Sequence, residues 1–270
     1  MSTDMKCHIS LLSRGTERRR SREQHVVDGR FGYINIARSE DDFWIRPLPH
    51  GACGTNEGAL HCRSRSLATV ALARIQLVAA SALYTSTGDL PRCSPALVVG
   101  SGPVALGAAL ELNRLGCPHV VVHTDGRATG LALPTVEGIE IEAHVAEDRR
   151  FGLLIDAVCS PQSIALALAH CERNGTLGLL GTPEGRTSLD LYQVHRQNIK
   201  LLGLHELNSA DNQRQALLQN IHQWLTAHHA ELAQTVCKIH PSTTFERNYP
   251  ALLERSQPFL IHGFDWSSQG

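Results

Sequence analysis

The feature that most constrains this chain is a glycine-containing turn between an apolar run and a helical segment. Residues 95–99 are apolar, Gly100 and Gly102 follow, and residues 104–115 have helical spacing with Ala105 in the first turn. In the pattern G-x-G-x-x-A, the first glycine permits a tight turn and the second lets backbone approach a pyrophosphate. The small alanine lets the helix lie close to the strand. The pattern predicts a strand–turn–helix unit that binds a dinucleotide.

The start of this helix supplies the chemistry that a diphosphate needs. The first N–H groups of a helix have no partner within it, and the helix dipole places partial positive charge there. We therefore expect the phosphates to contact the turn formed by Gly100, Ser101, Gly102, Pro103 and Val104. The alternative is a glycine-rich turn without a ligand.

The end of the next strand should select between two forms of the cofactor. Residues 119–123 form a second apolar run, followed by Thr124, Asp125 and, two positions later, Arg127. An acidic residue at this strand end binds both ribose hydroxyls of NAD, whereas an arginine accommodates the 2′-phosphate of NADP. A neutral Thr124 with Arg127 nearby favours NADP(H), and Asp125 in that position favours NAD(H). Asp125-Gly126 can also be only a turn.

Strand and helix patterns continue to alternate after this unit. Ser160 is a helix N-cap, and Asn174-Gly175 is a helix stop. The alternation predicts an α/β, Rossmann-type doubly wound parallel sheet. We expect strands at 139–144, 152–159, 176–180 and 199–204, and helices at 160–173 and 189–196.

The flanking segments have weaker patterns. Residues 1–60 are irregular and rich in Arg, Gly and Ser, and residues 61–91 are helical in pattern. After the alternating region we expect a long helix at 211–234, strands of a different sheet at 236–239 and 259–264, and a helix at 245–256 broken by Pro250. The predicted domain boundaries are 1–90, 91–207 and 208–270, with the last segment returning to the first.

Composition narrows the function classes. The formal net charge of -1 gives no general attraction to nucleic acid. No apolar run reaches the roughly 18 residues of a membrane span, because Arg74 and Gln76 interrupt the most apolar stretch. The 8 cysteines form no C-x-x-C pair, as expected of reduced thiols. We expect a cytoplasmic protein with a small-molecule substrate and without nucleic-acid or membrane partners.

Two stretches carry a family resemblance. VVGSGPVALGAALELNRLGCPHVVVHTD and LLIDAVCSPQSIALALAHCERNGTLGLLGTPEGRTSLDLYQVHRQNIKLLGLHE resemble the cofactor domain of the medium-chain dehydrogenase/reductase superfamily, the zinc-type alcohol dehydrogenase relatives. The resemblance implies NAD(P) binding and a homodimer. It also implies a GroES-like β domain built from the N-terminus and the C-terminal tail. It places Gly181 and Thr182 beside the nicotinamide, and we include Cys159 among the cofactor contacts.

The N-terminal part departs from that family. Only about 94 residues precede the cofactor domain where the family has about 150, so the β domain is expected to be truncated. In the segment Ser10–Glu17, Arg14 stands where the family has its first zinc-ligating cysteine, and Tyr33 stands in place of the zinc-ligating histidine. The chain resembles shortened, zinc-free members among natural-product reductases and bacteriochlorophyllide dehydrogenases. No metal site is expected.

Without zinc, hydride transfer to a carbonyl needs another proton donor or oxyanion stabiliser. Tyr33 and Arg14 are the catalytic candidates, with Thr16, Glu17 and His50 weaker. Tyr33 can instead be a packed aromatic, and Arg14 belongs to a basic stretch that is typical of a solvated face. A zinc site that uses His50, Cys53, His61 and Cys62 is disfavoured, because adjacent residues point in different directions.

Three hypotheses follow for function. The first is a zinc-independent NAD(P)(H) oxidoreductase that transfers hydride to or from a carbonyl, imine or activated alkene of a small specialised metabolite in a biosynthetic pathway. The second is a cofactor-binding pseudo-enzyme or partner subunit without redox turnover. The third is an enzyme that recycles bound NAD(P) during an isomerisation, epimerisation or cyclisation.

Overall fold

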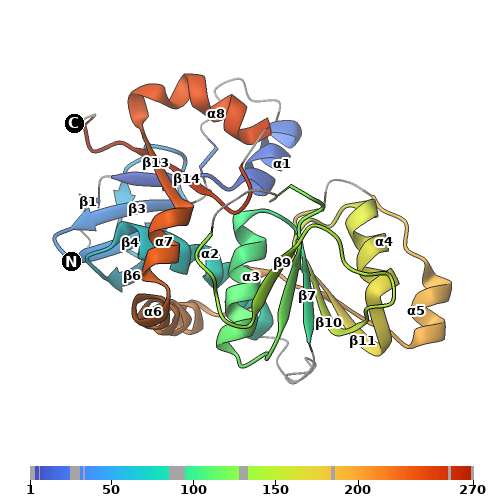
Figure 1. Ribbon diagram of the computed structural model, residues 1–270. Helices are drawn as coiled ribbons and strands as arrows, with labels where there is room; N and C mark the ends of the chain where they lie inside the picture. Colours follow the sequence, from blue (N-terminus) through green and yellow to red (C-terminus); the bar gives the residue numbers. More distant parts are fainter. Residues whose placement is uncertain are drawn as a thin grey trace. The chain divides into compact units, whose positions relative to one another are not determined.

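The computed structural model divides the chain into two compact units (Figure 1). One unit comprises Met1–Arg74 and Asp211–Gly270, and the other comprises Ile75–Ala210. The structure describes residues 4–5, 7–24, 31–32, 34–84, 95–127, 133–183, 186–254 and 257–268.

The unit Ile75–Ala210 contains a six-stranded, entirely parallel sheet. Its strand order is β12-β11-β10-β7-β8-β9, which in order of appearance along the chain is 3-2-1-4-5-6 read from β9. That is the order of a Rossmann sheet, so the predicted fold class is confirmed. The strands are β7 (Ala96–Val99), β8 (Val120–His123), β9 (Ile139–Glu142), β10 (Phe151–Asp156), β11 (Cys171–Leu179) and β12 (Lys200–Gly203).

Helices cover both faces of this sheet (Figure 1). Helix α3 (Pro103–Arg114) lies on one face, and α4 (Pro161–His170) and α5 (Leu191–Gln197) lie on the other. Side chains of α4 pack with Leu97, Val121 and Leu154 in one buried cluster. Strands buried on both faces are apolar throughout instead of alternating, which explains the continuous runs ALVV and VVV in the sequence.

Two predicted helix boundaries were wrong. Helix α4 ends at His170, not near residue 173, because Cys171 is buried and already pairs with Phe151 in the sheet. The helix expected at 211–234 is two helices, α6 (Asp211–His228) and α7 (Ala230–Val236). His229 interrupts them with φ −139° and ψ 29°, outside helical geometry.

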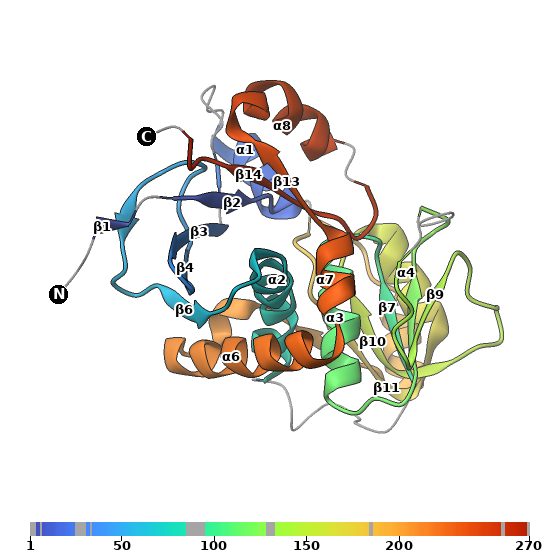
Figure 2. The ribbon, with the colours of Figure 1, turned by 60° about the vertical axis from the view of Figure 1, so that its left-hand side comes forward.

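The other unit has a second six-stranded sheet, of order β13-β14-β2-β3-β4-β6 (Figure 2). It joins strands from both ends of the chain: β2 (Ile9–Leu11), β3 (Ile34–Ser39), β4 (Asp42–Arg46) and β6 (Leu60–Arg63) with β13 (Cys237–Pro241) and β14 (Ile261–Asp265). A separate pair, β1 (Asp4–Met5) and β5 (Gly54–Thr55), is antiparallel. Helices α1 (Arg14–Gln24) and α8 (Phe245–Glu254) belong to the same unit.

The prediction that residues 1–60 are irregular was therefore wrong. In β4, burial alternates so that Phe43 and Ile45 face the core, a period-two pattern that short strands show only weakly. In the segment predicted as helical, β6 comes first and helix α2 runs from Leu67 to Tyr84.

Helix α2 is the one described helix that is long and apolar enough to span a membrane, by length and composition alone. Its mean hydropathy is 1.6, and 78% of it is buried inside the protein. Such burial is also what the core helix of a folded protein shows.

Candidate cofactor site

The glycine turn has the geometry that the sequence predicts. Gly100 has φ +141°, a conformation that residues with a side chain rarely adopt. A Cβ there would lie 3.2 Å from Ala105 Cβ and 3.3 Å from Val158 Cγ2. The Gly100 amide donates to the carbonyl of His123 on β8, at 2.9 Å. Gly100 is thus fixed between three neighbouring segments at the end of β7.

Gly102 faces open space. It is the N-cap of α3, with φ −89° and ψ 172°, and no atom lies within 4 Å of the position of a Cβ. No side chain caps the helix, and Pro103 has no amide hydrogen to donate. The Gly102 carbonyl accepts from Ala105 and Leu106, while the amides of Gly102 and Val104 have no partner among the described residues. An anion approaching this end meets unused donors and the positive end of the dipole.

A third glycine brings α3 close to α2. A Cβ on Gly107 would lie 3.0 Å from both Gln76 Cα and Ile75 O, so only glycine fits there without movement. Gln76 then donates to Glu111 of α3 at 3.0 Å, and Glu111 also pairs with Arg114 at 2.7 Å. These contacts hold α3, and with it the turn, within its unit.

The sheet topology concentrates the predicted cofactor residues at one edge. In a Rossmann sheet the ligand binds outside the carboxyl ends of the strands, where the strand order reverses. Here the reversal lies between β7 and β10, which are adjacent and parallel. Gly100 follows β7, Thr124 follows β8, Cys159 follows β10 and Gly181 follows β11, so all four lie at this carboxyl edge.

Asp156 organises the loop after β10, and the sequence analysis assigned it no role. It is fully buried, and its Oδ1 accepts from the amides of Val158 (2.8 Å) and Cys159 (2.9 Å). Its Oδ2 accepts from the Ser163 hydroxyl at 2.7 Å. Burial raises the pKa of Asp156, and these hydrogen bonds oppose that rise. An acidic residue that ends an apolar strand just before Ser160 is the signal that could have identified it.

The loops after β10 and β11 are packed against each other. A Cβ on Gly181 would lie 2.6 Å from the carbonyl carbon of Val158, so glycine is required there. The Gly181 amide donates to the Asp156 carbonyl at 2.9 Å. The Cys159 thiol donates to the same carbonyl at 3.5 Å, and burial raises its pKa to about 12. Cys159 is therefore a neutral thiol, and Thr182, half-buried, follows the packed glycine.

The predicted ribose-binding positions are divided between a buried and an exposed group. Thr124 is buried, and both its amide (3.0 Å) and its hydroxyl (3.2 Å) donate to the Glu142 carbonyl. Asp125 has φ +53°, and the Arg127 amide closes a turn onto Thr124 O at 3.1 Å. The side chains of Asp125 and Arg127 are both exposed. The hydroxyl of Thr124 thus bonds within the protein, and the cofactor contacts of Asp125 and Arg127, both exposed, stay a prediction.

In the other unit, Arg14 is held by a helix end. Its Nε donates to Leu253 O and its Nη2 to Glu254 O, each at 2.6 Å. These are carbonyls of the last turn of α8, where a cation is favourable. The structure therefore shows Arg14 as a C-terminal cap of α8, and its catalytic role stays a prediction. Tyr33 lies outside the described residues.

The weaker candidates Glu17 and His50 meet in a buried polar network. His50 Nε2 lies 2.9 Å from Glu17 Oε2, and both side chains are fully buried. Glu17 also accepts from Tyr249 OH at 2.8 Å and from the Ser13 amide at 2.7 Å. His50 Nδ1 lies 2.7 Å from Ser10 Oγ, which also accepts from the indole nitrogen of Trp266 at 2.8 Å. Every polar group of this network has a partner, so its evident role is structural.

The alternative zinc ligands do not come together. His50 is in the buried network, His61 pairs with Asp42 at 2.7 Å, and Cys62 is buried. Among the described residues, no three His, Cys, Asp or Glu side chains are grouped so as to hold a metal ion.

Comparison with known proteins supports the fold. No protein-family model and no curated protein matches the chain. Solved structures do match: TarJ from S. aureus in complex with NADPH has a TM-score of 0.71 and 12% identity, covering 98% of this chain and 91% of that one. A short chain alcohol dehydrogenase from E. coli CFT073 with NADH has a TM-score of 0.69, 11% identity and the same coverage. An alcohol dehydrogenase zinc-binding domain protein from Burkholderia ambifaria has a TM-score of 0.72 and 11% identity, and the match covers 98% of this chain and 91% of that one. At these identities the likeness shows the fold.

Proposed function

We propose that this protein is a zinc-independent NAD(P)(H)-dependent oxidoreductase of medium-chain type. Its substrate would be a carbonyl, imine or activated alkene, or the reduced counterpart, of a small specialised metabolite in a biosynthetic pathway. The observation that carries the proposal is the uncapped start of α3 at Gly102, at the point where the strand order reverses. The similar structures that hold NADPH and NADH have the same fold.

The residues of the turn fit a dinucleotide. The open space beside Gly102 admits a diphosphate, and the amides of Gly102 and Val104 would bind it. When bound, the nicotinamide supplies or accepts the hydride. Packing of Gly181 against Val158 would keep Thr182 and the loop after β11 in place beside the ring.

NADP(H) is the preferred cofactor in this proposal. Arg127 is exposed after the turn, and a guanidinium binds phosphate with paired hydrogen bonds. In a fluorescence titration, Arg127→Ala should weaken NADPH binding about tenfold and leave NADH binding unchanged, with Arg150→Ala, an exposed arginine after the same sheet's β9, as the control. Equal losses for both cofactors would contradict this preference.

For catalysis we propose Tyr33 as proton donor and Arg14 as the positive charge that stabilises a developing alkoxide. A tyrosine hydroxyl can donate a proton, and a guanidinium keeps its charge at all working pH values. The hydrogen bonds of Arg14 to α8 would hold its guanidinium in one orientation. We also propose that the protein acts in the cytoplasm as a homodimer.

The test of turnover is NADPH consumption by the purified protein across a panel of aldehydes, ketones, imines and enones. Consumption that Tyr33→Phe abolishes, with NADPH affinity unchanged, supports the proposal. Tight NADPH binding without consumption would instead identify a cofactor-binding protein without redox turnover. Cofactor that copurifies and is never released would point to internal recycling.

A further inference from the structure

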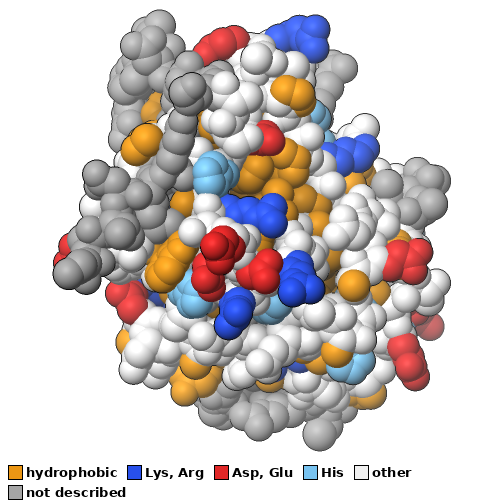
Figure 3. Space-filling model, turned by 90° about the vertical axis from the view of Figure 1, so that its left-hand side faces the viewer, with side chains coloured by type: hydrophobic (Ala, Val, Ile, Leu, Met, Phe, Trp, Pro, Cys, Tyr) orange, Lys and Arg blue, Asp and Glu red, His pale blue; other side chains and the backbone are white. Residues whose placement is uncertain are grey.

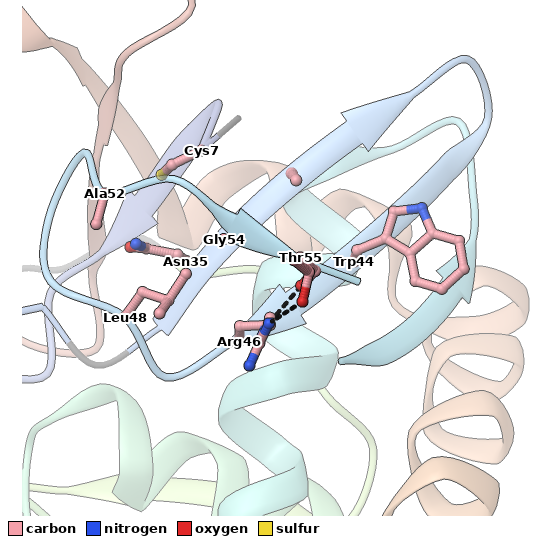
Figure 4. A pocket seen from close by; sticks show the side chains of 9 residues that line it. Cys7, Asn35, Trp44, Arg46, Leu48, Ala52, Gly54 and Thr55 are labelled. Atoms are coloured by element: carbon pink, nitrogen blue, oxygen red, sulfur yellow. Dashed lines mark hydrogen bonds between the residues drawn. The ribbon is translucent and has the colours of Figure 1, made fainter. Parts of the chain in front are cut away.

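The unit built from both chain ends has a hollow on β3 and β4 that is too small for an organic ligand. On the side of the molecule that carries β4 and β6, hydrophobic side chains lie beside charged ones (Figure 3). Arg46, which lines the hollow, donates to the carbonyl and the hydroxyl of Thr55 (Figure 4). The enclosed space admits about one water molecule. A reactive pair of residues lies instead in the unit Ile75–Ala210.

This pair is Asn174-Gly175, the one Asn-Gly dipeptide in the sequence. The side chain of asparagine is an amide, and its carbonyl carbon can form a five-membered ring with the backbone nitrogen of the next residue. A glycine in the second position leaves that nitrogen unshielded, because glycine has no Cβ. Asparagine accordingly ranks among the thermolabile residues of proteins.

The fold places Asn174-Gly175 in a bulge near the start of β11. The register between β10 and β11 shifts after Cys171, and regular pairing resumes at Thr176. Among the described residues, 172–175 have no register partner in either neighbouring strand. A bulge disrupts the ladder locally, and Asn174 is exposed there with φ +64°. The backbone around this dipeptide is therefore not held by strand pairing.

The packing of the bulge requires glycine at position 175. A Cβ there would lie 2.7 Å from Cys171 Sγ and 2.9 Å from Glu172 O, and Cys171 is itself buried. Both distances are too short for real contacts, so a larger residue would displace the bulge. The residue that the packing demands is thus also the one that leaves its nitrogen open to attack.

A neighbouring side chain activates the Asn174 amide. Asn198 Nδ2 donates to Asn174 Oδ1 at 2.9 Å, and both side chains are exposed. Asn198 is the C-cap of α5, with φ +53°. When a nitrogen attacks Asn174 Cγ, negative charge develops on Oδ1. A donor that is already placed at this oxygen stabilises the charge.

We propose that Asn174 is a modification site, at which the folded protein deamidates spontaneously. The Gly175 nitrogen forms a bond to Asn174 Cγ, and its proton leaves with the side-chain amide nitrogen as ammonia when that C–N bond breaks. Water then adds across one C–N bond of the cyclic imide and leaves aspartate or isoaspartate at position 174. The reaction needs only water, so it does not depend on the proposed redox function.

Mass spectrometry of the full chain, incubated in mildly alkaline buffer and then digested, tests the proposal. The peptide that contains Asn174 should gain the mass difference between an amide and a carboxylic acid. An isoaspartyl methyltransferase should label part of that peptide. Asn208 and Asn220 are exposed but precede a serine and an isoleucine. These internal controls should stay unmodified over the time in which half of Asn174 reacts.

The variant Asn198→Gly separates the role of the structure from that of the dipeptide. Glycine adopts the left-handed C-cap conformation freely, so the variant keeps the cap and loses only the donor. Deamidation of Asn174 should slow about fivefold in the folded variant, as expected for one lost hydrogen bond. In urea, where the two side chains are apart, the wild type and the variant should react at equal rates.

Three results would overturn the proposal. Asn174 that stays intact in the folded protein and reacts only in urea would show that the bulge holds the nitrogen away from Cγ. Modification of Asn208 as fast as that of Asn174 would show that no particular site exists. An unchanged rate in folded Asn198→Gly would refute the activation that the hydrogen bond is proposed to supply.

Discussion

Replacing Gly102 by valine separates cofactor binding from folding. The position has backbone angles that any residue adopts and no atom within 4 Å of a Cβ, so the free energy of unfolding should stay within about 0.5 kcal/mol of the wild type. The new side chain would occupy the space of the diphosphate. A hydrogen bond to a charged group contributes about 1.5–3 kcal/mol, and the amides of Gly102 and Val104 supply two. Their loss costs about 3 kcal/mol or more, which corresponds to about a hundredfold weaker binding.

The assay is a fluorescence titration of NADPH, accompanied by urea denaturation of each protein. Gly203→Val is the matched control, since Gly203 at the end of β12 also has nothing within 4 Å of a Cβ and has an ordinary φ. NADPH affinity that is unchanged in folded Gly102→Val protein would refute the assignment of the turn. Affinity lost equally in Gly203→Val would show that the effect is not local.

Three further variants test how much buried polar groups stabilise the unit in which each lies. Asp156→Ala removes three hydrogen bonds to a buried carboxylate, one of them from the buried Cys159 amide, and should cost about 3 kcal/mol or more in urea denaturation. Burial lowers the pKa of His262 from 6.5 to about 4. The Nε2 atom of His240 lies 3.0 Å from His262 Nδ1, and burial lowers the pKa of His240 too. The neutral forms are therefore favoured in the folded state, and stability should fall as pH drops from about 6.5 towards 4; His262→Leu should flatten that dependence. Tyr249→Phe removes a hydrogen bond to the buried Glu17 carboxylate and should cost about 2 kcal/mol in the same denaturation assay.

Each of these expectations has a contrary result. An Asp156→Ala protein as stable as the wild type would show that the loop does not need the carboxylate. A stability profile of His262→Leu that falls with acid as steeply as the wild type would assign the titration to other groups. A Tyr249→Phe protein as stable as the wild type would mean that Glu17 finds another donor.

The sequence predicted the unit around Gly100 well because its signals are local. Strand, turn and helix follow within about twenty residues, and each has a steric requirement that a particular residue type meets. The first sixty residues were harder to predict, because β2, β3 and β4 are short and the sheet is completed by β14 from the other end of the chain, which pairs with β2. Ser10 and Trp266 share a hydrogen bond across 256 positions, and Glu17 and Tyr249 across 232. No periodicity in one sequence reports such contacts, so this network was missed.

Among the described residues of the unit built from both chain ends, the polar groups around Glu17 and those around Asn35 differ in how far the protein satisfies them. Around Glu17 and His50 every donor and acceptor is matched within the protein, and the rings of Phe245, Tyr249 and Phe264 surround the imidazole at 5.2 to 6.2 Å. A fully satisfied network in an apolar shell contributes rigidity and needs no ligand. At Asn35 and Arg46 one acceptor and one donor are left over beside a cavity. The desolvation free energy of Asn35 Oδ1 and Arg46 Nε is therefore not recovered by partners among the described residues, whereas that of the groups around Glu17 is.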